Sequence, residues 1–270
     1  MSGRVIVITS GKGGVGKTTS TANIGTALAK NGARVAMIDT DIGLRNLDLL
    51  MGLENRIVYT LIDYLQEKCK LNQALIKDKK NPNLALLAAA QTCDKSAVTA
   101  EQMKAVCDEL KEKFDYVLVD SPAGIEQGFQ NAIAGANEAI IITTPEMSAV
   151  RDADRIIGLL EANEEILNYK LILNRVRPQM IQANDMLSVT DVTDILSVNL
   201  LGVIPEDENI IISTNRGEPI VNMEESKAGT AYNNIAKRIL GEEVAIPDFE
   251  TPPPTFVERL KKLFLTPAKV

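Results

Sequence analysis

A glycine-rich stretch near the amino terminus carries residue types that bind phosphate. It reads G-K-G-G-V-G-K-T-T and matches the G-x-x-x-x-G-K-[ST] pattern of phosphate-binding loops. Because glycine has no Cβ, the backbone N–H groups of such a loop can approach an anion closely. Lys17 is then expected to reach the β- and γ-phosphates of a nucleotide, and Thr18 to offer its hydroxyl to Mg²⁺. The residues expected around the phosphates are Gly11, Lys12, Gly13, Gly14, Val15, Gly16, Lys17, Thr18 and Thr19.

Three aspartates lie at the ends of apolar segments that are typical of buried strands. Asp39 closes the segment 34–39, Asp41 follows two residues later, and Asp120 closes the segment 115–120. An aspartate at the end of a buried strand matches the Walker B arrangement, which holds Mg²⁺, often through water. Asp39 and Asp41 are two residues apart, so their carboxylates are expected to point in opposite directions at the rim of the sheet. One can face the metal and the phosphate loop, and the other can face the γ-phosphate. The alternative for this pair is a polar loop that caps the next helix.

Strand-like and helix-like segments alternate along the chain and would position these side chains. The expected strands are 4–9, 34–39, 83–89, 115–120, 138–144, 170–174 and 200–205. The expected helices are 20–30, 60–66, 99–113, 148–162, 188–197 and 225–240, with Thr99 and Ser148 as N-caps and a further turn or helix at 71–76. This order predicts an α/β fold with a doubly wound, mostly parallel sheet, which binds ligands at the carboxyl ends of its strands.

The composition limits the chemistry that the chain can perform. It has 270 residues and no histidine, so acid–base work falls to Asp, Glu, Lys, Ser, Thr, a metal or water. Its three cysteines match no metal or disulfide pattern, and we expect them to be reduced. No apolar run approaches the length of a bilayer span and no signal peptide pattern is present, which favours a cytoplasmic protein. The net charge of −7 gives no reason to expect a nucleic-acid partner.

The last fifteen residues differ in composition from the rest. Residues 256–270 carry four basic side chains and one acidic one, a net +3, so the remainder of the chain carries −10. In a helix over 256–265, the apolar side chains lie on one face and the basic ones outside it, as in helices that lie in an anionic membrane surface. A terminal helix docked on the body is the alternative. The residues expected at the membrane are Phe256, Val257, Arg259, Leu260, Lys261, Lys262, Leu263 and Phe264.

The phosphate loop and the first aspartate segment resemble those of a known ATPase family. K-G-G-x-G-K-T-T at 12–19 resembles the deviant Walker A family, in which Lys12 would reach the nucleotide of a dimer partner. A solvated surface lysine is the alternative for Lys12. D-x-D-I-G-L-R-N-L-D-L-L-M-G-L-E-N-R from residue 39 resembles switch I of the MinD branch of this family. The resemblance implies that Asp41 positions or deprotonates the attacking water and that Asp39 supports the metal site.

Other site residues follow from the same resemblance. The turn S-P-A-G at 121–124 resembles switch II, in which Gly124 would bring an N–H group to the γ-phosphate. The residues implied on the adenine side are Asn174, Arg175, Pro205 and Asp207, which their spacing alone would leave as polar loops. The resemblance makes Lys12, Lys17 and Asp41 the catalytic residues, and it makes Thr18, Asp39 and Asp120 the metal ligands.

The resemblance covers essentially the whole chain and implies a function. It implies a Mg²⁺-dependent ATPase that forms a homodimer on ATP, holds to the inner face of the membrane by its tail, and helps to place the division septum. The implied partners are a MinC-like division inhibitor and a MinE-like ATPase activator. The expected parts are an ATPase domain at 1–243, an acidic and proline-containing linker at 244–255, and the amphipathic tail at 256–270.

Three other functions compete with this interpretation. A DNA-partition ATPase of the ParA type would carry a basic surface outside the tail, and the −10 of the body speaks against it. An iron–sulfur ATPase of the nitrogenase reductase type needs cysteines beside switch II, and residues 115–149 contain none. A membrane adaptor with an inactive nucleotide site would not need the intact Lys12, Lys17, Thr18, Asp41 and Asp120.

Overall fold

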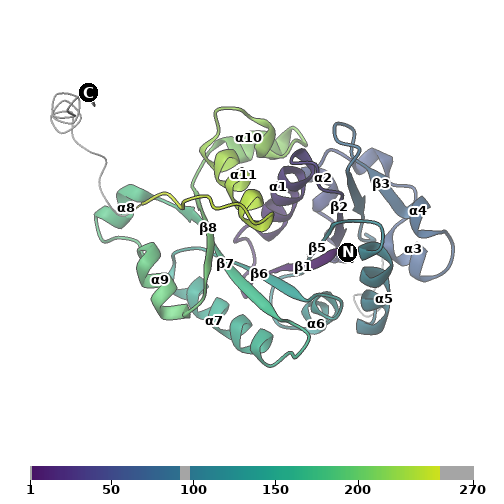
Figure 1. The fold of residues 1–270 in the computed structure, drawn as a ribbon, viewed down its shortest axis with the longest axis horizontal. Coiled ribbons are helices and arrows are strands. Elements are labelled where there is room, and N and C mark those ends of the chain that lie inside the picture. Colours follow the sequence, from purple (N-terminus) through teal and green to yellow (C-terminus); the bar gives the residue numbers. More distant parts are fainter. Residues whose placement is uncertain (1, 92–97, 250–270) are drawn as a thin grey trace, which may run out of the picture.

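The computed structural model describes residues 2–91 and 98–249, which form an eight-stranded sheet covered by helices on both faces (Figure 1). The strand order is β3-β4-β2-β5-β1-β6-β7-β8, and every neighbouring pair is parallel except β3 and β4. The strands are β1 (Arg4–Thr9), β2 (Val35–Asp39), β3 (Leu75–Lys77), β4 (Leu84–Leu87), β5 (Tyr116–Asp120), β6 (Glu138–Thr143), β7 (Asn168–Val176) and β8 (Leu200–Pro205). The predicted α/β fold with a doubly wound, mostly parallel sheet is confirmed.

The helices of the described residues are α1 (Lys17–Lys30), α2 (Leu47–Leu50), α3 (Leu61–Leu65), α4 (Leu71–Ala74), α5 (Ala100–Lys111), α6 (Gln127–Ile133), α7 (Met147–Glu161), α8 (Pro178–Gln182), α9 (Val189–Leu196), α10 (Asn209–Asn215) and α11 (Lys227–Ile239). Single turns of 3₁₀ helix occupy Glu54–Arg56 and Ile220–Asn222. None of these helices is long and apolar enough to cross a membrane.

The side chains of the central strand β1 alternate between two hydrophobic cores. Val5 and Val7 belong to the core that α5, α6, α7 and α9 cover, whereas Ile6 and Ile8 belong to the core beneath α1 and α11. A strand that is buried on both faces needs apolar residues at every position, not at alternate ones. This burial explains the continuous apolar runs by which the sequence marks the central strands.

Most of the expected elements are present, and the differences have local causes. All seven expected strands form, with ends that differ from the prediction by at most two residues. The turn or helix expected at 71–76 forms α4 over its first four residues, but its last two residues belong to the edge strand β3. This strand was not predicted, because a segment of three residues has no periodicity to recognise. Thr99 caps α5 as predicted, since its side chain accepts a hydrogen bond from the Gln102 N–H. The prediction for Ser148 was wrong: α7 begins at Met147, and Ser148 lies inside its first turn.

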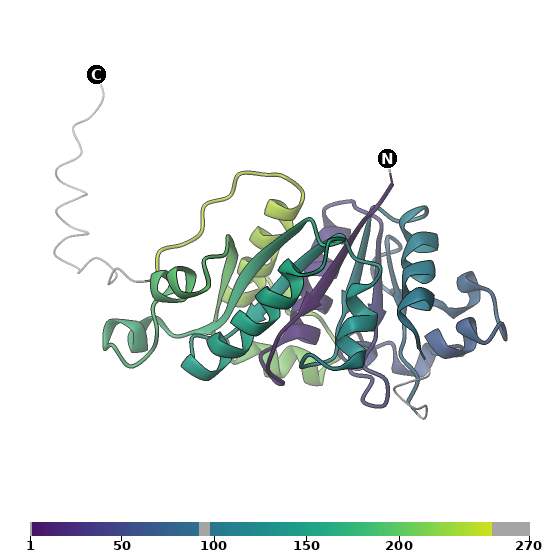
Figure 2. The same ribbon diagram turned by 90° about the horizontal axis from the view of Figure 1, so that it is seen from below.

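The segment after α11 returns to the end of the sheet that carries the phosphate loop. The Arg238 guanidinium donates hydrogen bonds to Val244 O at 2.7 Å, to Ala245 O at 2.8 Å and to Leu201 O on β8 at 3.0 Å. From there the segment passes across β8 toward α8, and the described chain ends at Phe249 (Figures 1 and 2). The first half of the expected linker is therefore held on the body. The rest of that linker and the predicted amphipathic tail lie outside the described residues.

Candidate nucleotide-binding site

The phosphate loop joins β1 to α1, as the strand–turn–helix pattern predicts. Helix α1 begins at Lys17, and Gly16 precedes it with a φ of +102°, a backbone conformation that favours glycine. The Lys17 ammonium lies 3.0 Å from Ser10 Oγ, and the residue is only 7% exposed. Burial lowers the pKa of Lys17, and the carboxylates of Asp120 and Asp41 oppose this effect. Lys17 is thus held close to two of the predicted acidic residues.

Asp39 and Asp120 form a buried pair of carboxyl groups at the end of two adjacent strands. They are register partners in β2 and β5, and each is 1% exposed. Asp39 accepts hydrogen bonds from the backbone N–H of Asp41 at 2.9 Å and of Leu47 at 3.2 Å. Thr21 Oγ1 donates to Asp120 Oδ1 at 3.0 Å, but the buried Oδ2 of Asp120 has no well-formed hydrogen bond.

The environment of this pair disfavours its negative charge. Burial, together with the neighbouring Asp39, raises the pKa of Asp120 to about 8. Burial also raises the pKa of Asp39 to about 6, against the effect of its two backbone hydrogen bonds. Two carboxyl groups and the Thr18 hydroxyl are hard oxygen donors of the kind that Mg²⁺ prefers, and a cation there would relieve the unfavourable burial. The donor set therefore fits the predicted metal.

The loops after β2 and β5 lie beside the phosphate loop. The Thr40 hydroxyl donates to Asp120 O at 2.6 Å, which ties the two loops together. Asp41 follows, half-buried and close enough to Lys17 to raise the pKa of that lysine. Gly124, with a φ of +92°, donates its N–H to Ser10 O at 3.3 Å. The structure thus brings both predicted switch segments to the phosphate loop.

Lys12 forms an ion pair and a hydrogen bond within its own chain. Its ammonium lies 3.2 Å from Glu146 Oε2 and 3.1 Å from Ser148 Oγ, at the start of α7. The Lys12 side chain is 40% exposed and that of Glu146 is 58% exposed, so water screens the ion pair. The expected contact of Lys12 with a dimer partner stays a prediction. The role of Ser148, which the sequence suggested as a helix cap, is to accept this hydrogen bond from Lys12.

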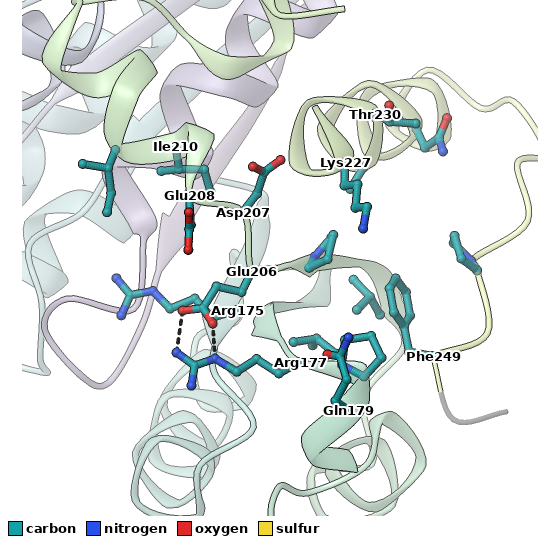
Figure 3. Close-up of a pocket in the computed structure, with 18 of the residues that line it drawn as sticks. Arg175, Arg177, Gln179, Glu206, Asp207, Glu208, Ile210, Lys227, Thr230 and Phe249 are labelled. Carbon is teal, nitrogen blue, oxygen red and sulfur yellow. Dashed lines mark hydrogen bonds and ion pairs between the residues drawn. The ribbon is translucent and has the colours of Figure 1, made fainter. Parts of the chain in front are cut away.

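A cavity of about 970 Å³ adjoins the loops after β7 and β8 (Figure 3). Arg175, Pro205 and Asp207, which were expected on the adenine side, line it. The Asp207 carboxylate accepts hydrogen bonds from Ser226 Oγ at 2.8 Å and from the Ala228 N–H at 3.2 Å, so it also fixes the start of α11.

The opposite wall of the cavity consists of residues that the sequence did not indicate. Lys227 and Thr230 extend from α11, and Phe249 belongs to the returning segment (Figure 3). Lys227 and Thr230 are three residues apart and therefore share a helix face, but nothing in the sequence relates that face to the β7 and β8 loops. Phe249 lies in the expected linker, where its packing against the body gives no local signal.

Asn174 occupies a different place from the other residues expected on the adenine side. It is 4% exposed and is not among the residues that line the cavity. Its Nδ2 donates to Val15 O in the phosphate loop at 2.7 Å. Asn174 is thus brought directly to the phosphate loop.

Comparison with known proteins agrees with this geometry. A model of the family described as "CobQ/CobB/MinD/ParA nucleotide binding domain" matches residues 6–220. The chain is 58% identical to the septum site-determining protein MinD of Synechocystis, over 97% of this chain and 98% of that protein.

Two solved structures extend the comparison. The MinC:MinD cell division protein complex of Aquifex aeolicus matches with a TM-score of 0.84 and 50% identity, over 92% of this chain and all of that chain. MinD of Pyrococcus horikoshii in complex with Mg-ADP matches with a TM-score of 0.80 and 33% identity, over 87% of this chain and 95% of that chain.

Proposed function

The chain belongs to the MinD family of septum site-determining ATPases, and from this premise we propose that it is a Mg²⁺-dependent switch that dimerises on ATP and binds the inner face of the cell membrane. The membrane-bound ATP dimer recruits a division inhibitor and so helps to place the division septum. The observation that carries this proposal is the buried pair of Asp39 and Asp120, of which Asp120 lies close enough to Lys17 in the phosphate loop to affect the pKa of that lysine.

The rim of the sheet is suited to a magnesium nucleotide with few protein ligands. Mg²⁺ keeps several of its waters and binds one or two carboxylates together with the phosphates of the substrate. Thr18 and Asp120 would hold it, with Asp39 as support, and the Oδ2 of Asp120, which has no well-formed hydrogen bond within the chain, fits this role. Bound there, Mg²⁺ neutralises charge on the phosphates. Lys17 adds a positive charge that burial shields from water, which strengthens its attraction to phosphate.

Asp41 is the residue that we assign to the attacking water. It lies in the loop after β2, half-buried and near Lys17, whereas Asp39 is fully buried beside Asp120. A carboxylate in that place can orient a water molecule and accept its proton as the bond to the γ-phosphate forms. Because the two aspartates differ in burial, we assign Asp41 to the water and Asp39 to the support of the metal site.

Dimerisation would bring in Lys12 from the partner. In the described chain Lys12 pairs with Glu146 and Ser148, so it must leave them before it can reach a second nucleotide site. An exposed ion pair contributes little to stability, so little free energy opposes this rearrangement. A cation that arrives from a second protomer stabilises the charge of the transition state, as an arginine finger does.

We propose that the amphipathic tail at 256–270 is the membrane anchor, on the strength of its apolar and basic faces. The described part of the chain ends at Phe249, which lies in the wall of the cavity beside the loops after β7 and β8. One amphipathic segment of about ten residues binds a membrane weakly and reversibly. Two segments on one dimer gain from effective concentration, so the nucleotide state controls attachment.

The proposed partners rest on the relatives. The Aquifex aeolicus structure is named as a complex of MinC with MinD, and its MinD chain is 50% identical to this one. We therefore propose a MinC-like division inhibitor as a partner of the ATP dimer. A MinE-like ATPase activator is proposed from the family resemblance alone.

Sedimentation with vesicles tests the proposed switch. We expect the chain to sediment with phosphatidylglycerol-containing vesicles in ATP and to stay in solution in ADP. Phe264→Glu and truncation after Thr255 should abolish sedimentation and leave ATP-dependent dimerisation intact. Leu265→Glu is the matched control, because it makes the same charge change off the predicted apolar face and should weaken binding much less.

Two results would contradict the proposal. Equal sedimentation of the parent in ATP and ADP would exclude the nucleotide switch. Equal sedimentation of the parent and the truncated chain would exclude the tail as the anchor.

A further inference from the structure

Asn174 is placed by an irregularity in β7. The register between β7 and β8 shifts between Leu173 and Val176, and Arg175 has a φ of +57°. Such bulges turn a side chain away from the direction that a regular strand would give it. The side-chain oxygen of Asn174 accepts the Arg175 N–H at 2.9 Å, which fixes the orientation of its amide.

The Asn174 amide is packed against the phosphate loop. Its Nδ2 donates to Val15 O at 2.7 Å, across 159 positions of sequence. A Cβ added to Gly16 would stand 2.4 Å from the same Nδ2, so the amide lies directly on the Gly16 backbone. The contact is buried, since Asn174 is 4% exposed and Val15 also 4%.

This contact fixes one peptide group of the loop. The C=O of Val15 and the N–H of Gly16 belong to the same planar trans peptide and point in opposite directions. Because Asn174 holds the carbonyl, the Gly16 N–H must point away from Asn174. Gly16 is the residue just before α1, where backbone N–H groups bind phosphate.

We infer that Asn174 is a positioning residue of the phosphate site, which orients the Val15–Gly16 peptide for every nucleoside triphosphate whatever its base. The inference rests on the proposed ATP binding and differs from the expected role of Asn174 in recognising adenine. A residue that only recognises the base affects ATP alone. A residue that orients the loop affects ATP, GTP and a triphosphate without a base by the same factor.

The test measures the affinity of Asn174→Asp for three ligands, each with Mg²⁺: ATP, GTP and inorganic tripolyphosphate. In this variant an oxygen replaces the amide donor and faces Val15 O. We expect all three dissociation constants to rise by a similar factor, about tenfold. Asn174→Ala should give a smaller rise of the same pattern and serves if the Asp variant does not fold. Asn163→Asp is the matched control, because the Asn163 side-chain oxygen only accepts a hydrogen bond, from the Glu165 N–H, and keeps that ability.

Hydrogen–deuterium exchange without ligand separates local positioning from a general loss of structure. We expect faster exchange at residues 13–17 in Asn174→Asp and unchanged exchange in β4 and α5. General destabilisation would instead speed exchange throughout and leave the affinity of the folded fraction unchanged, a result that would overturn the inference.

The results distinguish this inference from the proposed function. If the parent binds none of the three ligands, the proposed ATP binding fails. If the parent binds them and Asn174→Asp loses affinity for ATP alone, with unchanged exchange at 13–17, the inference is overturned.

Discussion

Replacing Asp120 with asparagine should stabilise the protein in the absence of metal and nucleotide. Asp120 is fully buried next to Asp39, and its pKa is raised from 3.8 to about 8. Each unit of pKa corresponds to ~1.4 kcal/mol, so an ionised Asp120 costs the folded chain on the order of 5 kcal/mol. The asparagine side chain of the variant carries no charge, but its buried amide N–H groups lack a partner at the position of Oδ2, which costs about 1 to 3 kcal/mol. We therefore expect a net gain of about 2 to 4 kcal/mol in the free energy of unfolding at about pH 8.5.

The pH dependence of this gain has a definite sign. Because the folded-state pKa of Asp120 lies above the unfolded one, the folded parent binds more protons, and it loses stability as the pH rises from 3.8 through about 8. Asp120→Asn does not share this loss. The advantage of the variant should therefore be small near pH 4, grow with pH and level off above pH 8.

Urea unfolding in EDTA, without nucleotide, between pH 4 and 9 measures this difference. Asp115→Asn is a control of opposite sign, since hydrogen bonds from Arg34 lower the pKa of Asp115. That variant should be less stable than the parent above pH 4. A variant Asp120→Asn that is less stable than the parent at pH 8.5, or whose advantage does not vary with pH, would refute the reasoning.

Three further predictions concern the chemistry. Asp41→Ala should bind ATP nearly as the parent does but not hydrolyse it, so dimers accumulate; turnover like that of the parent in a phosphate-release assay would exclude Asp41 as the residue that activates water. Lys12→Ala should lose ATP-dependent dimerisation and turnover, and a normal dimer with normal turnover by light scattering and phosphate release would rule out its role across the interface. Glu146→Gln should release Lys12 from an exposed ion pair in both protomers, so the dissociation constant of the ATP dimer should fall by up to about tenfold in analytical ultracentrifugation. A weaker dimer would show that Glu146 does not compete for Lys12.

The features that are continuous in sequence were predictable from it. The phosphate loop lies between a strand and a helix within residues 4–30, so its identity needs no distant contact. Buried strands require apolar residues at every position, which makes their runs visible, and an aspartate that ends such a run must lie at the rim. The family resemblance carried the prediction further, to residues that are polar loops by their spacing alone.

The sequence alone did not show which segments of the chain contact one another. Asp39 and Asp120 become partners because β2 and β5 are neighbours in the sheet, and strand order depends on packing over the whole chain. Tertiary structure likewise places Ser148 within hydrogen-bonding distance of Lys12. It also places Phe249 and Arg175, which are far apart in the sequence, in the walls of the same cavity. The tertiary structure also turns Asn174 toward Val15, through a bulge in β7 that no local sequence pattern predicts. Local residue patterns determine which elements form and what chemistry each can offer, whereas long-range packing decides which of those groups lie within hydrogen-bonding distance.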